Sequence, residues 1–322
     1  MEIERLEAWL TAADPAPWVV ETSGSTGAPK RVVLSRDAVL ASVTASARRV
    51  GGSGRWLLAL PPSYVAGLQV ICRSLVAGHA PVLLEDHPSF AEAARHADFV
   101  SLVPTQLHRL LETDADALRS FHTVLLGGGP IDPGLRRRSE DAGVRVVATY
   151  GSAETAGGCV YDGYALDGVA IAIDAGGRVR IAGPTLFDGY ADDPAATAQV
   201  LVDGWFLTSD AGRLDEDGRL HVLGRIDDIV VSGGVNVPAP AVAARLREHP
   251  EIAAAEVLGV PDEEWGNRLV AFVVGAVSLD EARAWVGEAH ARSWAPRQLV
   301  VVDEIPLLPN GKPDRLTLRG MA

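Results

Sequence analysis

Residues 22–30 read Thr-Ser-Gly-Ser-Thr-Gly-Ala-Pro-Lys and gather hydroxyl groups, glycines and one lysine in a single short segment. Glycines let the backbone approach a ligand closely, and successive backbone N–H groups together with hydroxyls can surround phosphate oxygens. Lys30 adds a mobile positive charge. The segment therefore predicts a phosphate-binding loop. Its candidate residues are Thr22, Ser23, Gly24, Ser25, Thr26, Gly27 and Lys30.

The P-loop of kinases and other nucleotide hydrolases is one alternative for this segment, and an ordinary Ser/Gly hairpin turn is another. A P-loop needs glycine directly before its lysine and a helix directly after it. Here Pro29 precedes Lys30, and the β-rich run at residues 32–34 follows. Because a second β-rich run occupies residues 18–20, we expect the loop to join two strands, which disfavours a P-loop kinase.

Four further side chains have types suited to a nucleotide site. Tyr150 ends a predicted strand, where ligands bind in an open α/β sheet, and its ring could stack on a purine. Glu154 follows in a loop of small residues, and Mg²⁺ often takes one carboxylate plus phosphate oxygens. Asp210 could accept hydrogen bonds from both ribose hydroxyls, and Arg225 could donate to ribose or phosphate. Taken singly, these residues could also be a core tyrosine, a solvated acid, a turn-forming aspartate and a surface ion pair.

Lys312 lies in the proline-flanked loop IPLLPNGKPDR near the end of the chain. Transfer of a phosphoryl group to a carboxylate develops negative charge, and a preorganised cation aimed at that charge lowers the barrier. Lys312 is therefore a candidate catalytic residue, although a lysine near a C-terminus is by default a surface residue.

These segments resemble the motifs of the adenylate-forming superfamily, which contains acyl- and aryl-CoA ligases, luciferases and the adenylation domains of peptide synthetases. The matching segments follow the order of that family. They are TSGSTGAPK at 22–30, GGGP at 127–130, YGSAET at 150–155, TSD at 208–210 with Gly212, GRIDD at 224–228 and PNGK at 309–312.

The resemblance implies an enzyme that activates a carboxylic acid with ATP and Mg²⁺, and then passes the acyl group to coenzyme A, with release of AMP and pyrophosphate. It implies catalytic roles for Lys312, Lys30 and Glu154, with Glu154 holding the metal. It implies a hinge at Asp227 and a thiol tunnel lined by Gly233 and Gly234. The further nucleotide-binding residues that it implies are Gly128, Gly129, Pro130, Tyr150, Gly151, Ser152, Thr155, Asp210 and Arg225.

Within the superfamily the chain most resembles o-succinylbenzoate–CoA ligases of menaquinone biosynthesis, in a short form. The segments ETSGSTGAPKRVVLS, ALPPSYVAGLQVICRSL and GPTLFDGY carry this likeness. It implies an acid pocket lined by Tyr64, Val65, Ala66 and Gly67, with Arg73 holding a second carboxylate. An arginine in an apolar helix needs an anionic partner, which an internal Asp or Glu could also supply.

The sequence leaves several alternatives for the activity. Another acyl- or aryl-CoA ligase, a stand-alone adenylation domain and an inactive nucleotide-binding relative are the alternatives. Many relatives carry His near the position of Tyr64, and most carry Gly where Arg31 stands. Larger members also have further sequence before the phosphate loop, so the closure of the acid pocket, and a homodimer that would assist it, are open.

The elements that must position these residues alternate along the chain. Predicted strands at residues 80–84, 99–103, 123–126 and 144–149 alternate with helices that begin near Ser89, Gln106 and Pro133, which indicates an α/β sheet with crossover helices. From Gly158 onward, short strands with turn signals predict a mostly β subdomain. We expect the adenylate-forming α/β fold, with a large domain at 1–224, a small mobile α+β domain at 225–322 and a hinge near 225–228.

Composition narrows the class of partner. The chain has 322 residues and a net charge of −13, which disfavours nucleic acid and anionic membranes. Its two cysteines, Cys72 and Cys159, have no metal-binding spacing. The N-terminal segment lacks a signal-peptide core, and no apolar run is long enough to insert into a membrane, so we expect a cytoplasmic protein that acts on small molecules.

Overall fold

The computed structural model describes residues 2–22, 30–307 and 313–322. These form two compact units, here called unit 1 and unit 2. Unit 1 comprises Met1–Ala172, Arg180–Thr208 and Leu214–Leu220, and unit 2 comprises Ile173–Val179, Ser209–Arg213 and His221–Ala322. The hinge expected near residues 225–228 concerns motion between domains and stays a prediction.

Unit 1 is organised around a seven-stranded sheet with the order β4-β3-β5-β6-β7-β8-β9. Its strands are β3 (Trp56–Leu58), β4 (Val82–Leu83), β5 (Phe99–Leu102), β6 (Thr123–Leu126), β7 (Val146–Ser152), β8 (Gly157–Tyr161) and β9 (Tyr164–Ala165). Strands β4, β3, β5, β6 and β7 are parallel, and β8 and β9 continue the sheet as an antiparallel hairpin. Every residue of β5 and β6 is buried, as expected for parallel strands covered on both faces. The predicted alternation of strands and helices is confirmed.

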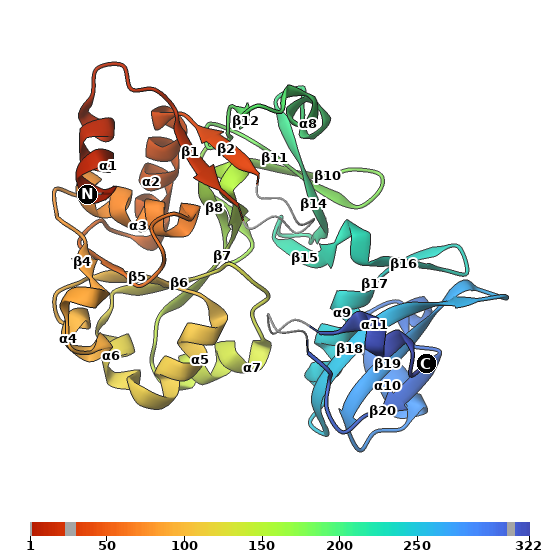
Figure 1. The fold of residues 1–322 in the computed structure, drawn as a ribbon. Coiled ribbons are helices and arrows are strands. Elements are labelled where there is room, and N and C mark those ends of the chain that lie inside the picture. The colour runs from red at the N-terminus through yellow and green to blue at the C-terminus, as the bar shows by residue number, and fades with distance from the viewer. Residues whose placement is uncertain (1, 23–29, 308–312) are drawn as a thin grey trace. The chain divides into compact units, whose positions relative to one another are not determined.

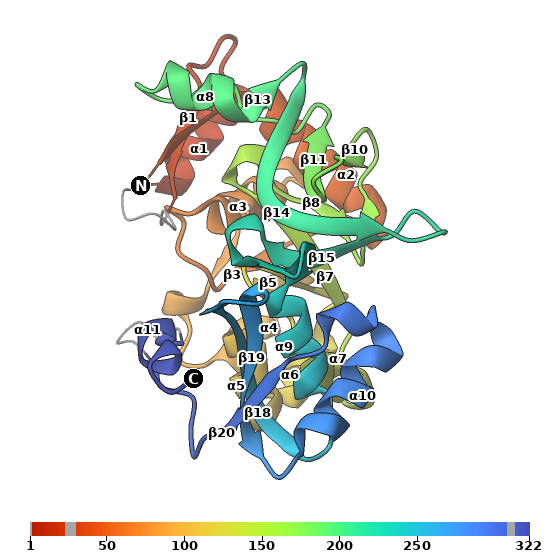
Figure 2. The ribbon, with the colours of Figure 1, turned by 90° about the vertical axis from the view of Figure 1, so that its right-hand side faces the viewer.

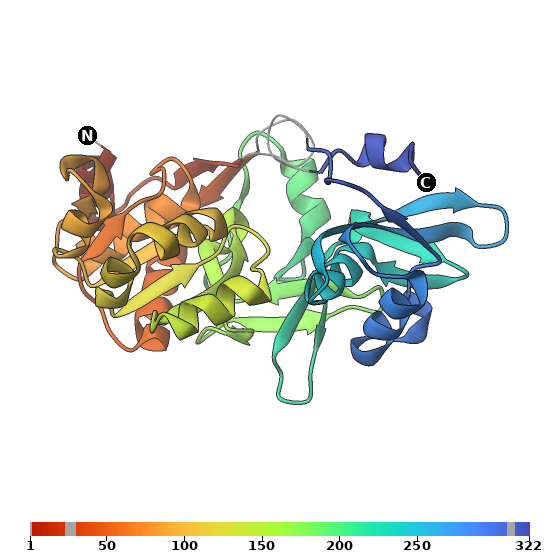
Figure 3. The same ribbon diagram turned by 90° about the horizontal axis from the view of Figure 1, so that it is seen from below.

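Helices cover both faces of this sheet (Figure 1). The helices are α1 (Glu2–Thr11), α2 (Arg36–Val50), α3 (Val65–Val76), α4 (Phe90–Ala94), α5 (Pro104–Thr113), α6 (Ala115–Ser120) and α7 (Pro133–Asp141). Helices α2 and α3 pack on one face through Val50, Val70 and neighbouring side chains. Helices α4 to α7 pack on the other through Leu107, Leu118 and neighbouring side chains, and Figure 3 views unit 1 from their side. Burial of each such leucine stabilises the fold by about 1.5–3 kcal/mol.

A smaller antiparallel sheet carries the two ends of the candidate phosphate loop. It has the order β1-β2-β12, with β1 at Trp18–Glu21, β2 at Arg31–Leu34 and β12 at Gly189–Tyr190. The loop therefore joins two strands, as predicted, and no helix follows Lys30 directly. Ser35 caps α2 by accepting a hydrogen bond from the backbone N–H of Ala38, as expected for a serine before a helix.

Between residues 170 and 225 the chain alternates between segments of unit 1 and segments of unit 2. Its remaining elements are β10 (Ala170–Ile173), β11 (Arg178–Ala182), α8 (Pro194–Val200), β13 (Leu201–Val202), β14 (Trp205–Leu214) and β15 (Leu220–Arg225). The run of short strands predicted after Gly158 is present, with two differences. Strands β8 and β9 extend the main sheet, and α8, capped by Asp193, interrupts the run of strands.

Unit 2 holds a three-stranded sheet, β18-β19-β20 (Figure 2), and a hairpin, β16-β17 (Figure 1). The strands are β16 (Ile229–Ser232), β17 (Val235–Pro238), β18 (Ile252–Asp262), β19 (Gly266–Gly275) and β20 (Gln298–Val301). Helices α9 (Ala239–Arg247) and α10 (Leu279–Ala289) pack on one face of the sheet, and Leu318 of α11 (Arg315–Arg319) packs on the other. Among the described residues, no helix is both long and apolar enough to cross a membrane.

Both cysteines are fully buried in unit 1, Cys72 in α3 and Cys159 in β8. Burial raises the pKa of each thiol to about 12, although Arg73 beside Cys72 opposes the shift there. With a pKa of about 12, roughly one thiol in ten thousand is ionised at pH 8.

We therefore predict that iodoacetamide at pH 8 leaves both cysteines of the folded protein unmodified, because the thiolate is the nucleophile and both side chains are inaccessible. Intact-mass measurement should show no addition in buffer and two additions after unfolding in guanidinium chloride. Alkylation of the folded protein at the rate of a free thiol would contradict the prediction.

Candidate active site

A cavity of about 120 Å³ lies in unit 1 at the carboxyl ends of β5, β6 and β7. In an open α/β sheet this edge is where ligands bind. Its lining residues come from the segment before α3, from α3 itself and from the four strands β5 to β8 with the loops that follow them. They are Leu60, Val65, Ala66, Gln69, Arg73, Ser101, Leu102, Val103, Leu125, Gly127, Gly128, Thr149, Gly151, Ser152, Gly157, Gly158 and Tyr161. The cavity thus gathers segments that are distant in sequence.

Arg73 enters this cavity from α3 and is only 7% exposed. Its guanidinium lies 4.9 Å from the centre of the Trp56 ring and donates a hydrogen bond of 3.2 Å to the hydroxyl of Tyr161. Its Nε is buried without a hydrogen-bond partner. In the described part of the chain no carboxylate lies within 4 Å of Arg73, so the internal Asp or Glu considered from sequence does not pair with it there.

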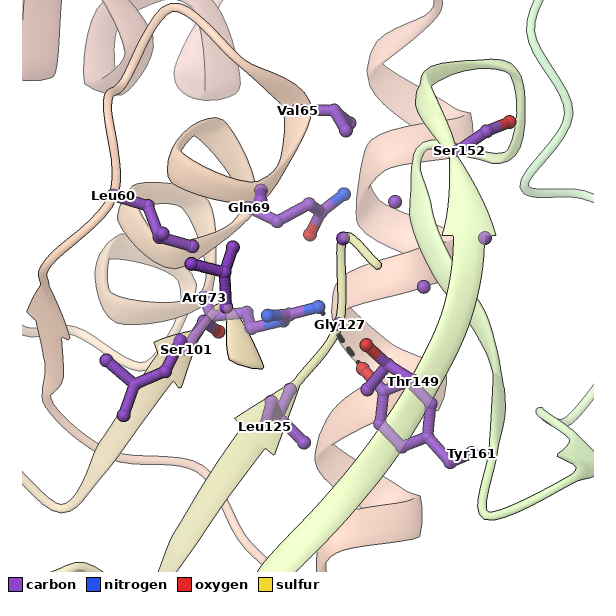
Figure 4. Close-up of a pocket in the computed structure, with 17 residues that line it drawn as sticks. Leu60, Val65, Gln69, Arg73, Ser101, Leu125, Gly127, Thr149, Ser152 and Tyr161 are labelled. Atoms are coloured by element: carbon purple, nitrogen blue, oxygen red, sulfur yellow. Dashed lines mark hydrogen bonds between the residues drawn. The ribbon is translucent and has the colours of Figure 1, made fainter. Parts of the chain in front are cut away.

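Gln69 lies one helical turn before Arg73, on the same face of α3. Its Nε2 donates a 2.7 Å hydrogen bond to the carbonyl oxygen of Ala156, whereas its Oε1 is buried without a partner. Figure 4 shows Gln69 and Arg73 on one side of the cavity and Thr149 and Tyr161 on the other. The site therefore presents one buried cation and one open acceptor to whatever fills it.

The predicted acid-binding residues divide into two groups. Val65 and Ala66 line the cavity with Arg73. Tyr64 and Gly67 are not among its lining residues. Tyr64 occupies the N-cap position of α3 and is 47% exposed. A Cβ on Gly67 would stand 2.2 Å from the carbonyl oxygen of Pro61, so glycine is required there for close packing of the chain.

The predicted nucleotide-binding residues of unit 1 also divide. Gly128, Gly151 and Ser152 line the cavity, whereas Gly129 and Pro130 do not. Tyr150 lies between the lining residues Thr149 and Gly151 in sequence and is half-buried, but it is not itself among the residues that line the cavity.

Thr155 is fully buried. Its hydroxyl accepts a hydrogen bond from the backbone N–H of Ser152 and donates to the carbonyl oxygen of Gly157. Thr155 therefore shapes the turn that carries Glu154.

Lys30 and Glu154, which are far apart in sequence, both contact Tyr190. The hydroxyl of Tyr190 donates a 2.8 Å hydrogen bond to Oε1 of Glu154. The ammonium of Lys30 lies 4.7 Å from the centre of the same ring. Burial raises the pKa of the Tyr190 hydroxyl, and the Glu154 carboxylate adds to the shift.

The two ends of the phosphate loop are closed by Thr22. Its backbone N–H donates to the carbonyl oxygen of Lys30, and its hydroxyl accepts from the backbone N–H of Lys30. Ser23, Gly24, Ser25, Thr26 and Gly27 lie outside the described residues, as does Lys312.

In unit 2, the two predicted ribose-binding residues lie close together, with a guanidinium nitrogen of Arg225 3.8 Å from a carboxylate oxygen of Asp210. Asp227 belongs to the short turn Ile226–Asp228. Gly233 and Gly234 form the turn between β16 and β17, and both have positive φ. A Cβ on Gly233 would stand 2.6 Å from the ring of Trp265, so only glycine fits beside that ring.

The Glu154 carboxylate fits a role as a Mg²⁺ ligand. Mg²⁺ in nucleotide sites is commonly held by one or two carboxylates together with phosphate oxygens. One oxygen of Glu154 is held by Tyr190, and no Lys or Arg among the described residues lies within 4 Å of the carboxylate. The other oxygen can therefore face a cation.

Sequence reasoning missed Gln69, Tyr161 and Tyr190. Gln69 had a usable signal, because Val65, Gln69 and Arg73 recur every four residues and so share one face of α3. Tyr161 had none, and Tyr190 had only its place at the end of the segment GPTLFDGY. Their partners could not be read from sequence, because they lie 88 and 36 residues away.

Comparison with known proteins agrees with this geometry. The family described as AMP-binding enzyme matches residues 6–191, and the AMP-binding enzyme C-terminal domain matches residues 241–312. A probable 2-succinylbenzoate–CoA ligase of Mycobacterium tuberculosis is 40% identical over 95% of this chain and 84% of the relative. The 2-succinylbenzoate–CoA ligase of Listeria monocytogenes is 32% identical over 98% of this chain and 71% of the relative.

Solved structures give the same result. The o-succinylbenzoate–CoA synthetase of Bacillus subtilis, in complex with its acyl-adenylate intermediate, matches with a TM-score of 0.78 and 30% identity over 94% of this chain and 68% of that chain. An amide bond synthetase of Marinactinospora thermotolerans matches with a TM-score of 0.78 and 32% identity over the same shares. The expected fold class is confirmed, and the chain belongs to the family of AMP-binding enzymes, whose adenylate-forming fold it carries.

Proposed function

We propose that this protein is an ATP-dependent acid–thiol ligase that converts o-succinylbenzoate into its coenzyme A thioester. The relatives that act on this acid by name support the substrate. The observation that carries the proposal is the guanidinium of Arg73, buried in the cavity without a carboxylate partner among the described residues. o-Succinylbenzoate has two carboxylates, so one can react while the other meets Arg73 in a bidentate pair.

In the first half-reaction, an oxygen of the free carboxylate attacks the α-phosphorus of ATP. A bond from carboxylate oxygen to phosphorus forms, and the bond to the bridging oxygen of pyrophosphate breaks. Arg73 holds the acid, which removes much of the entropic cost of bringing the two reactants together. Lys30 holds the phosphates, and Lys312 stabilises the charge that develops on the reacting oxygens.

Mg²⁺ supplies neutralisation of the phosphate charge when it is bound. Glu154 is the carboxylate that would hold it, with Tyr190 fixing one of the two oxygens. Asp210 and Arg225 would bind the ribose and its neighbouring phosphate.

In the second half-reaction, the thiolate of coenzyme A attacks the acyl carbon of the adenylate. A carbon–sulfur bond forms, and AMP leaves with the electron pair of the broken carbon–oxygen bond. Gly233 and Gly234 form a turn without side chains, which would let a narrow pantetheine arm pass close to the backbone.

We predict that o-succinylbenzoate, ATP, Mg²⁺ and coenzyme A give o-succinylbenzoyl-CoA, AMP and pyrophosphate, detected by mass spectrometry. When coenzyme A is omitted, the acyl-adenylate and pyrophosphate should each form in about the same molar amount as the enzyme. A parallel reaction with a primary amine in place of coenzyme A tests the activity named for the Marinactinospora relative. No pyrophosphate release with o-succinylbenzoate, with either acceptor, would refute the proposed function.

We predict that Arg73→Met raises the KM for o-succinylbenzoate by roughly a hundredfold, because removing one partner of a buried ion pair leaves the other unpaired. The KM for ATP should stay within about twofold. The two monocarboxylate analogues, 4-oxo-4-phenylbutanoate and 2-butanoylbenzoate, identify the contribution of the second carboxylate. The wild type should discriminate strongly against both. The variant should lose most of the discrimination against the analogue that keeps the reacting carboxylate, and neither protein should activate the other analogue.

Arg136→Met is the matched control, since Arg136 pairs with Asp162 and Glu140 and does not line the cavity. It should leave the KM for o-succinylbenzoate unchanged. An equal change in both variants, or none in Arg73→Met, would remove Arg73 from the acid site.

We predict that Lys312→Ala lowers the rate of adenylate formation by at least roughly a hundredfold, because a cation aimed at the developing charge is lost. Thioester formation from supplied acyl-adenylate should be largely retained. Rapid-quench measurement of each half-reaction tests this, with Arg319→Ala as a control that removes a cation from the end of α11. Equal loss of both half-reactions would show that Lys312 does not act specifically in adenylation.

A further inference from the structure

Tyr190 contacts both Lys30 and Glu154. It ends β12, which pairs with β2, the strand that begins directly after Lys30. The side chain is 8% exposed, and its ring packs 5.1 Å from that of Phe187. The backbone N–H of Phe187 donates in turn to the carbonyl oxygen of Glu154. Packing on these sides fixes where the ring lies.

The hydroxyl and the ring face of Tyr190 act on different partners. The hydroxyl donates to one oxygen of Glu154, which restricts rotation of the carboxylate and leaves the second oxygen open. The ring face attracts the Lys30 ammonium without forming an ion pair, and such an interaction at a partly solvated site is weak. Because the ring face is not a hydrogen-bond acceptor of fixed geometry, the three N–H groups of the ammonium can bind phosphate oxygens while Lys30 stays beside the ring.

We propose that Tyr190 is a positioning residue of the nucleotide site, which orients the Glu154 carboxylate toward a phosphate-bound Mg²⁺ through its hydroxyl and holds Lys30 beside that position through its ring. This inference rests on the proposed ligase function for the roles of Glu154 and Lys30. It goes beyond the motif residues, because Tyr190 acts through both of them and touches no reacting atom.

Tyr190→Phe separates the two actions, because it keeps the ring and removes the hydroxyl. Calorimetry measures ATP binding to the full chain, once in EDTA and once in excess Mg²⁺, with no acid present so that no turnover occurs. The Kd in EDTA divided by the Kd in Mg²⁺ measures how much the metal contributes to binding. We expect Tyr190→Phe to reduce this ratio by roughly tenfold, the effect typical of a lost hydrogen bond to a charged group, and to leave the Kd in EDTA within about twofold.

Two further variants test whether the hydroxyl acts through Glu154. Glu154→Ala should reduce the same ratio, and adding Tyr190→Phe to it should cause no further reduction, because the partner is already absent. Tyr164→Phe is the matched control, since Tyr164 is 43% exposed and lies in β9, the edge strand of the main sheet of the same unit. It should keep the wild-type ratio.

Tyr190→Leu tests the ring. The chain contains two lysines, Lys30 and Lys312, so peptide mapping after reaction with an amine reagent reports each one separately. We expect faster labelling of Lys30 and a severalfold higher Kd for ATP in EDTA, with Lys312 labelled at the wild-type rate. If Tyr190→Leu does not fold, the Tyr190→Phe series decides alone, because phenylalanine fills the same space.

A wild-type ratio in Tyr190→Phe, with or without a lower melting temperature, would overturn the proposal and leave Tyr190 a packing residue. A further loss when Tyr190→Phe is added to Glu154→Ala would also overturn it. The proposed function fails separately, if the wild type binds ATP with help from Mg²⁺ but does not consume o-succinylbenzoate. If the wild type forms the product and the ratio is unchanged in Tyr190→Phe, only the role of Tyr190 is refuted and the proposed function stands.

Discussion

The site depends on the guanidinium of Arg73, which is buried without a carboxylate partner among residues 2–22, 30–307 and 313–322. Arg73 lies on the face of Trp56, which itself stacks on Phe99 at 4.9 Å, and bonds to a tyrosine hydroxyl that is shared with Ser46. These contacts solvate the cation only in part, and an uncompensated buried charge lowers the stability of the free protein. A ligand that brings a carboxylate restores the missing partner. Under the proposed function, the same feature that weakens the empty fold would select a dicarboxylic acid over a monocarboxylic one.

Lysine and arginine have different roles in this chain. The chain has Lys+Arg 29, of which Lys30 and Lys312 are the lysines and the rest are arginines. Arginine forms the structural ion pairs, such as those of Arg136 with Asp162 and Arg315 with Glu256. Its planar, pre-organised donors suit fixed partners, whereas the lysine ammonium is a compact charge on a flexible stem. In the proposed mechanism, lysine thus stands at the two positions where a flexible side chain has to reach the reacting phosphate.

The parts of the fold that could be predicted from sequence are those set by local patterns. Buried runs located β5 and β6, a serine cap began α2, and the β-rich run at residues 32–34 predicted a strand after the loop. The short helices α6, α8 and α11 were not predicted, because helices of five to seven residues depend on tertiary packing more than on propensity.

The residues of the site also differ in how far sequence could predict them. Arg73 stood out as a charge in an apolar helix, whereas the contacts of Tyr161 and Tyr190 arise only when distant strands come together.

An enzyme that makes acyl-adenylates carries a reactive electrophile next to its own side chains. The two thiols of this chain, Cys72 and Cys159, lie at 0% exposure and are held in the neutral form. A neutral, enclosed thiol is a poor nucleophile, so neither competes with an incoming acceptor for the acyl group. The hydrophobic core thereby protects the catalyst from acylating its own sulfur and leaves the choice of product to the thiol that arrives from solution.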